Sequence, residues 1–361
     1  MDYPELKRVL EALVDHSEAH TAGYVSVRSG TTPLRHFDCA YGVTADGRPA
    51  HEDDLVPVGC ATKPLLPLLL AQSAPHLLDA AISLAALGAG SRDHERALID
   101  VTVDDLLTHR SGICSPNAID WRLNGRSMGF DAFIENLTVN RERHTYSDFA
   151  AWVVLEHLFR KETGRDPADA IFEDILQPAG LGEDIVVSAT ELTDEMRERI
   201  AVPRINSRRG WVPLLSERVS SELELLRPAF GGIATCRGLA DLMLGVMRVD
   251  QGEFAAGMPN PWNYRRMVSV RGPEIPDAHN RRTFRYRGGF MDRAGAEGVD
   301  GLSDSALGHV GGFGLCLVLE DPVNDLAMAF YLNGISDAAP ELEMAKQTLL
   351  DAVLSAAVST P

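Results

Sequence analysis

The chain is poor in positive charge and in long apolar runs. Its 34 Lys and Arg residues are outnumbered by 52 Asp and Glu residues, which gives a formal net charge of -18. Such an acidic protein is not expected to bind nucleic acid or an anionic membrane. No apolar stretch approaches the roughly 20 residues of a spanning helix, and the start of the chain lacks the pattern of a secretory signal. We therefore expect a cytoplasmic protein.

Cysteine is also scarce, with 5 residues spread over the chain. No Cys-x-x-Cys pair or His-rich cluster suggests a metal site, so we expect no metal and no cofactor. An odd number of cysteines in a reducing compartment argues against a disulfide framework. We expect four of them to be small buried hydrophobic residues: Cys39, Cys114, Cys236 and Cys316.

The 361 residues are enough for a large core and two subdomains. Alternating apolar residues predict strands near both ends, and the middle of the chain has mostly helical spacing. The expected strands are 23–28, 35–43, 315–320 and 326–332, the last two forming a hairpin, and the expected terminal helices are 4–15 and 341–358. This pattern predicts one antiparallel sheet built from both chain ends.

The first motif that carries chemistry is Cys60-Ala61-Thr62-Lys63, at the start of the apolar run 64–70. On a helix, positions i and i+3 share a face, so the thiol and the ammonium are expected to lie together. A nearby cation favours the thiolate, which is the reactive form of cysteine. The alternative is a buried helix cysteine followed by a surface lysine.

Three later segments follow in order: Leu106–Gly112 (LLTHRSG), Tyr146-Ser147-Asp148, and His309–Gly314 (HVGGFG). Together with the first motif they resemble the penicillin-recognising serine hydrolases. The resemblance is to the class C β-lactamase branch with its esterases and transacylases, and it covers residues 55–334. Two positions depart from that pattern, because Cys60 replaces the serine and Asp148 replaces an asparagine.

The resemblance implies a β-lactamase/transpeptidase-like α+β fold. In it, an antiparallel sheet from both chain ends is flanked by helices, and a mainly helical subdomain is inserted. Residues 1–63 and 230–361 would form the α/β subdomain, and residues 64–229 the helical one. The active site would lie in the cleft between them.

The resemblance also assigns roles. Cys60 would be the nucleophile, Lys63 its partner, and Tyr146 a proton relay. His309 would hydrogen-bond that tyrosine or a substrate carboxylate. The backbone N–H groups of Cys60 and Gly312 would form the oxyanion hole.

Asp148, Gly311 and Phe313 would contact the substrate. An aspartate at position 148 would hold Lys63 in its charged form, which suits a cysteine nucleophile. Ser147 and Asp148 also look like helix N-cap residues. His109 lies in a motif that the family uses structurally, so we expect no catalytic role for it.

The segment 250–305 and residues 204–209 are rich in arginine. Surface arginines paired with the abundant carboxylates are the simpler explanation. The alternative is a rim for an anionic substrate or a carrier's phosphate, with 250–305 covering the cleft.

A cysteine acyl-enzyme is a thioester, which prefers amines over water more than an oxyester does. We therefore expect an acyltransferase that passes an acyl group from an ester or thioester donor to an amine or alcohol. The donor would be a small molecule, and a carrier-bound acyl group is the alternative. Similar transacylases serve natural-product assembly, including capuramycin-type antibiotics. The alternatives are an esterase or amidase of the same fold, and an inactive homologue that only binds a ligand.

Overall fold

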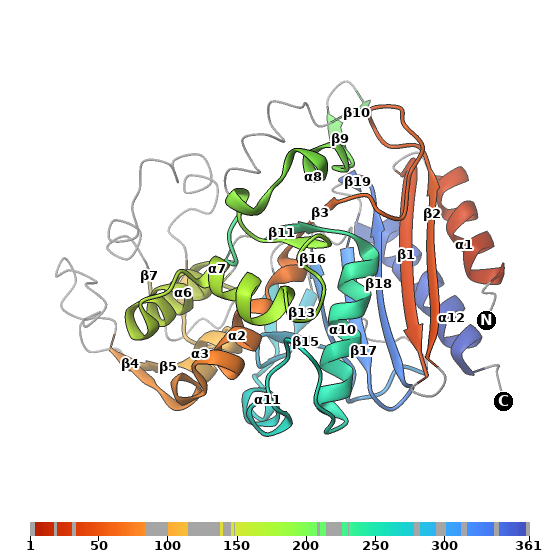
Figure 1. The fold of residues 1–361 in the computed structure, drawn as a ribbon. Helices are drawn as coiled ribbons and strands as arrows, with labels where there is room; N and C mark the ends of the chain where they lie inside the picture. Colours follow the sequence, from red (N-terminus) through yellow and green to blue (C-terminus); the bar gives the residue numbers. More distant parts are fainter. Residues whose placement is uncertain are drawn as a thin grey trace.

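One antiparallel sheet with helices on both faces forms the framework of the chain (Figure 1). These observations come from a computed structural model. It describes residues 4–17, 20–30, 34–83, 100–114, 138–139, 146–147, 149–207, 210–213, 226–229, 231–277, 282–293, 301–311, 316–335 and 339–358.

The main sheet has 7 strands drawn from both ends of the chain. In sheet order they are β14 (Tyr286–Arg287), β15 (Phe290–Asp292), β16 (Leu307–Gly311), β17 (Cys316–Asp321), β18 (Leu326–Leu332), β1 (Ala22–Ser29) and β2 (Arg35–Gly42). Strand β1 pairs antiparallel with β18, with Gly23 opposite Leu332. The predicted sheet from both termini is therefore confirmed, as is the hairpin of β17 and β18.

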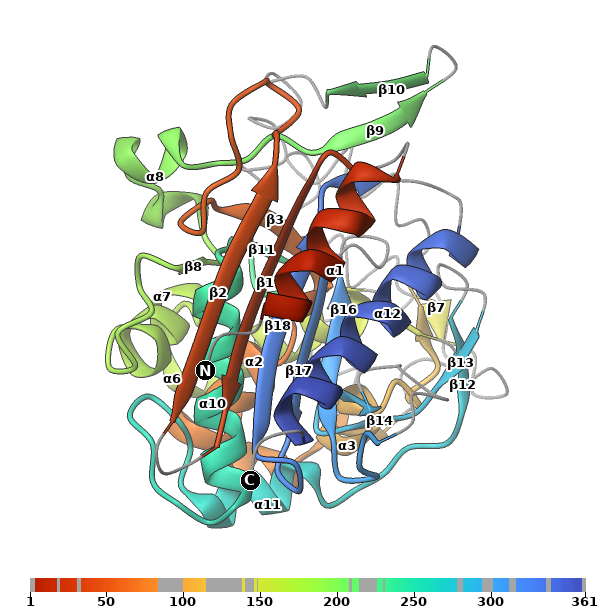
Figure 2. The same ribbon diagram turned by 90° about the vertical axis from the view of Figure 1, so that its right-hand side faces the viewer.

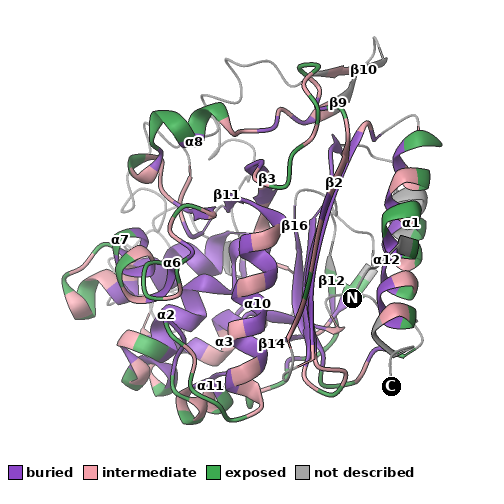
Figure 3. Ribbon diagram, turned by 45° about the vertical axis from the view of Figure 1, so that its right-hand side comes forward, coloured by how far each residue is buried: buried purple, intermediate pink, exposed green. Residues whose placement is uncertain are grey.

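The terminal helices α1 (Pro4–Asp15) and α12 (Ala339–Val358) lie side by side on one face of this sheet (Figure 2). Each of the two helices has buried residues on one side and exposed residues on the other (Figure 3). In α1, Leu6, Leu10 and Val14 are buried, at the four-residue spacing of an apolar helix stripe. Gly23 permits the close approach, because a Cβ there would lie 2.7 Å from Leu10 Cδ1.

The opposite face of the sheet is covered by α10 (Cys236–Asp250), which contacts β1, β17 and β18. Beyond α10 lies a helical part of the molecule. It contains α2 (Leu65–Ser73), α3 (Val103–Leu107), α6 (Ala150–Thr163), α7 (Pro167–Ile171) and α11 (Pro261–Val268). Helix α6 is capped by Gly164, whose φ of 72° places it in the left-handed region that closes many helices.

A small sheet, ordered β3-β11-β8, links the two parts. Its strands are β3 (Val56–Gly59), β11 (Gly232–Ala234) and β8 (Ile185–Val186). The remaining described strands are β4 (Ala81–Ser83), β5 (Asp100–Thr102), β6 (Ile113–Cys114), β7 (Thr138–Val139), β9 (Arg204–Ser207), β10 (Gly210–Pro213), β12 (Ile275–Asp277), β13 (Arg282–Phe284) and β19 (Gly334–Ile335). The remaining helix among the described α-helices, α8 (Asp194–Glu198), lies near β9 (Figure 1).

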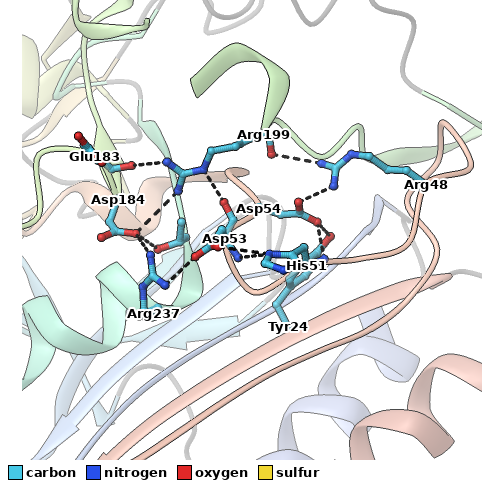
Figure 4. A network of polar contacts seen from close by, with 10 residues as sticks. Tyr24, Arg48, His51, Asp53, Asp54, Glu183, Asp184, Arg199 and Arg237 are labelled. Atoms are coloured by element: carbon cyan, nitrogen blue, oxygen red, sulfur yellow. Dashed lines mark hydrogen bonds and ion pairs between the residues drawn. The ribbon is translucent and has the colours of Figure 1, made fainter. Parts of the chain in front are cut away.

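A charged network fixes the start of β3 (Figure 4). Asp54 is 3% exposed and accepts hydrogen bonds from Tyr24 Oη and from Arg48. Arg237 joins Asp53 to Asp184 at N–O distances of 2.6 and 3.0 Å. The network lines a pocket of about 460 Å³. It ties the segment before β3 to the segment before β8, and Cys60 lies at the other end of β3.

The start of α6 and the limits of the two subdomains were also predicted from the sequence. The helix-cap prediction for Ser147 is wrong, because Phe149 is the N-cap of α6 and its side chain makes no cap bond. The subdomain limits stay a prediction, although α11 contacts α2 and so joins the helical part. Within the described part of the chain, no helix combines the length and apolarity needed to cross a membrane.

Candidate active site

Cys60 begins a tight turn at the end of β3. Gly59 has φ 52° and ψ -127°, and the 3₁₀ helix η1 (Cys60–Thr62) follows it. The Lys63 N–H donates to the Cys60 carbonyl at 3.0 Å. In a 3₁₀ helix residues i and i+3 lie above one another, so Lys63 follows Cys60 by one such turn. The expected contact between the thiol and the ammonium stays a prediction. Cys60 is half-buried.

The other cysteines with described burial behave as expected. Cys39, Cys236 and Cys316 are buried, and burial raises the pKa of each of these thiols. The burial of Cys114 falls outside what the structure describes. Among the described thiols, Cys60 is thus the accessible one.

Two glycines hold the backbone of this turn. A Cβ on Gly311, the last residue of β16, would lie 1.9 Å from the Val58 carbonyl oxygen and 2.6 Å from Ala61 N. A Cβ on Gly231, at φ +127°, would lie 2.5 to 2.6 Å from backbone atoms of Gly59. Since backbone atoms cannot swing aside as a flexible side chain does, only glycine fits at either position. Position 311, predicted to contact substrate, therefore also sets where Cys60 lies.

Lys63 is fully buried and is held by the helical part. Its Nζ donates to the Ala229 carbonyl at 2.9 Å and lies 5.4 Å from the centre of the Trp152 ring. The carboxylate of Glu156, one turn after Trp152 on α6, accepts from Ala229 N–H at 2.7 Å and from Arg227 Nη2 at 2.5 Å. Glu156 therefore fixes the carbonyl that receives the lysine.

Aromatic rings pack beside this lysine. The His109 ring stacks on Trp152 at 5.0 Å and lies 4.6 Å from the Tyr146 ring. Tyr286, from the segment 250–305, stacks on Tyr146 at 5.8 Å. The Tyr146 N–H donates to the Pro276 carbonyl. Two residues of segment 250–305, Pro276 and Tyr286, therefore contact Tyr146. The expected cover over the cleft stays a prediction.

His309 faces the same cluster from β16 as a neutral ring. It is 1% exposed, and burial together with the nearby Lys63 charge lowers its pKa to about 3. Its Nδ1 lies 2.6 Å from the Val310 carbonyl, which can only accept, so Nδ1 carries the proton. The Nε2 atom is then a bare acceptor. It suits a hydroxyl or amine donor, and it cannot donate to a substrate carboxylate.

His109 has the opposite tautomer. Ser147 N–H donates to its Nδ1 at 3.3 Å, and the Ser147 hydroxyl lies 2.8 Å from the same atom. Nδ1 is therefore the acceptor, and Nε2 carries the proton. Burial, with smaller effects of Lys63 and His309, lowers the pKa of His109 well below its usual value. The residue has φ 54° just after α3, at the helix-to-loop junction that the sequence predicted.

The structure thus links Lys63, Tyr146 and His309 through one cluster of rings. Cys60 lies one turn before Lys63, and the catalytic roles of these four residues stay predictions. Three predicted residues, Asp148, Gly312 and Phe313, lie outside the described residues, so their roles stay predictions.

Sequence reasoning missed the contributions of Trp152, Glu156, His109 and Tyr286. For Glu156 a signal was present, because a carboxylate inside an otherwise apolar helix needs a buried partner. For Tyr286 the local sequence holds no such signal.

Several arginines of 250–305 that the structure describes fit the simpler explanation. Arg266 pairs with Asp79 and Asp104, and Arg285 pairs with Glu274. Arg271 and Arg287 both pair with Asp292. Across the described ranges, no group of three His, Cys, Asp or Glu side chains is placed to hold a metal ion.

Fold and site together define an α+β protein in which the turn at Cys60 lies between a sheet and a helical part. The family model described as Beta-lactamase matches residues 7–352, and the chain belongs to that family. No curated protein matches the sequence closely enough to count as a relative.

Solved structures share the fold at low identity. A penicillin-binding protein homologue from Caulobacter crescentus is 19% identical, with TM-score 0.74 and coverage of 99% of this chain and 97% of that one. D-amino acid amidase from Ochrobactrum anthropi SV3 is 16% identical, with TM-score 0.73 and 99% of both chains covered. A mutant of simvastatin synthase (LovD) from Aspergillus terreus is 14% identical, with TM-score 0.74 and coverage of 99% and 98%. These likenesses show the β-lactamase-like fold.

Proposed function

We propose that the protein is an acyltransferase that forms a thioester on Cys60 and passes the acyl group to an amine or alcohol. The observation that carries this proposal is the position of Cys60. It is half-buried at a clamped turn, one 3₁₀ turn before a fully buried lysine. A thiol in that position is accessible to a substrate and adjacent to a cation.

The chemistry runs in two steps. The Cys60 sulfur attacks the carbonyl carbon of an ester or thioester donor and a C–S bond forms, while Tyr146 relays the thiol proton to the donor's alcohol or thiol, which leaves as its bond to the carbonyl carbon breaks. An amine or alcohol then attacks the thioester, Tyr146 relays its proton back to the Cys60 sulfur, and the C–S bond breaks to return the Cys60 thiol. His309 Nε2 accepts a hydrogen bond from Tyr146 or from the acceptor, and at a pKa of about 3 it does not take the proton at neutral pH.

Transfer rather than hydrolysis follows from the thioester, because amines attack thioesters in preference to water. Simvastatin synthase shares the fold, and so do an amidase and a family VIII carboxylesterase. We propose natural-product assembly, with amide or ester formation that needs no ATP, as the setting. A carrier-bound acyl group fits the donor role as well as a free ester.

Intact-protein mass spectrometry tests the proposal. The protein is incubated with a panel of acyl esters and thioesters, with and without a simple amine. Wild type is compared with Cys60→Ala and Cys60→Ser. Cys39→Ser is the matched control, because Cys39 is a thiol on β2, outside the site.

We expect an acyl adduct that requires Cys60, persists in Cys39→Ser, and disappears on adding amine as amide forms. An adduct that water clears as fast as amine does would identify a hydrolase instead. No adduct from any donor would favour a homologue that only binds a ligand.

A further inference from the structure

The carbonyl of Lys63 lacks its usual helical partner. In an α-helix this oxygen accepts from the N–H four residues later. That residue is Pro67, which has no N–H. Helix α2 starts at Leu65 with Pro64 as its N-cap, and the Lys63 carbonyl just before it has a gap where a helical N–H would donate. The backbone hydrogen bond described at this carbonyl comes from Leu66 N, at 3.3 Å.

Trp152 fills this gap. Its indole Nε1–H donates to the Lys63 carbonyl at 2.9 Å, while its ring lies 5.4 Å from Lys63 Nζ. One fully buried side chain thus contacts the lysine at its backbone and at its charged end. The Trp152 ring is closely packed against the backbone of Gly289. A Cβ on Gly289 would lie 2.7 Å from Pro67 Cγ and 3.3 Å from Trp152 Cζ2, so the ring has little room to move on that side.

We propose that Trp152 is a positioning residue that fixes Lys63 beside Cys60, and that Pro67 makes the indole N–H necessary. Trp152 and Glu156 are four residues apart on α6, so they share a helix face. One holds the lysine directly, and the other holds it through Ala229. Helix α6 therefore positions Lys63 through both residues. The inference rests on the proposed function only in giving Lys63 a task beside the thiol.

The test uses Trp152→Phe, Pro67→Ala and the double variant. Alanine at 67 restores a backbone N–H that can donate to the Lys63 carbonyl, so it should rescue the loss of the indole N–H. The matched control is Trp262→Phe, because Trp262 is 80% exposed on α11. Lys63→Ala gives the alkylation rate expected when the effect of the lysine on Cys60 is lost completely.

The readout is the rate of Cys60 alkylation by iodoacetamide between pH 5 and 9, with thermal unfolding measured in parallel. Alkylation needs no acyl donor, so it separates this inference from the proposed function. A negative acyl-transfer assay with the alkylation pattern intact would refute the function alone.

We expect Trp152→Phe to slow alkylation at neutral pH about tenfold, toward the rate of Lys63→Ala. The double variant should regain most of that rate, and Trp262→Phe should match wild type. The inference is overturned if Trp152→Phe alkylates like wild type, or if Pro67→Ala fails to rescue it. Should Trp152→Phe alone not fold, the double variant is compared with Pro67→Ala, and equal rates are the supporting result.

Discussion

Gly311→Ala is the sharpest test of how the turn at Cys60 is held in place. The added methyl would lie 1.9 Å from the Val58 carbonyl oxygen, and real Cβ contacts essentially never fall under 3.0 Å. The backbone around Cys60 must therefore retreat by about 1.1 Å, the difference between these two distances. Position 311 is not among the residues with positive φ, so the cost is steric.

A displacement of about 1 Å at reacting groups can lower a rate roughly 100-fold. Overpacking a filled core costs about 1–3 kcal/mol of the free energy of unfolding. We therefore expect Gly311→Ala to fold with reduced stability and to lose most of its Cys60 acylation. The assays are single-turnover acylation followed by mass spectrometry, and urea unfolding.

Gly245→Ala is the matched control. The three atoms nearest to its Cβ would be side-chain atoms of Met258, at 3.2 to 3.5 Å, and these can move. If Gly311→Ala acylates at the wild-type rate with wild-type stability, then β16 does not clamp the turn and the reasoning fails.

Two further predictions concern Glu156 and His309. Glu156→Gln should lower the free energy of unfolding, measured in urea, by about 2–3 kcal/mol, because it leaves Arg227, itself 34% exposed, without a buried carboxylate partner. The control is Glu162→Gln, at an exposed position on the same helix. Equal losses in the two variants would contradict the prediction. The pKa of His309 is about 3 when folded against 6.5 when unfolded. Between these values the unfolded chain binds a proton that the folded chain does not, so stability falls as pH drops from about 6.5, by up to about 1.4 kcal/mol per unit. His309→Gln should flatten this slope in urea titrations between pH 7 and 4, and an unchanged slope would show that His309 is not buried as a neutral ring.

Local patterns in the sequence were sufficient for the elements at both chain ends. The apolar stripe of α1 and the positions of strands β1 and β2 each depend on neighbours along the chain. The motif order also predicted that Lys63, Tyr146 and His309 lie in one site, and in the structure the same cluster of rings links them. Ser147 shows the limit, because its hydroxyl bonds His109, 38 residues away, instead of capping a helix.

What the sequence determined by itself was therefore the periodic elements, the order of the motifs and the family they resemble, because these depend on short-range spacing. Only the tertiary structure decided that Gly311 packs on Ala61, that Tyr286 stacks on Tyr146, and that Glu156 holds Ala229. It also decided the tautomers of both site histidines, which follow from bonds to Val310 and Ser147. Most of these contacts join residues far apart in the chain, and their geometry exists only once the sheet and helices have packed.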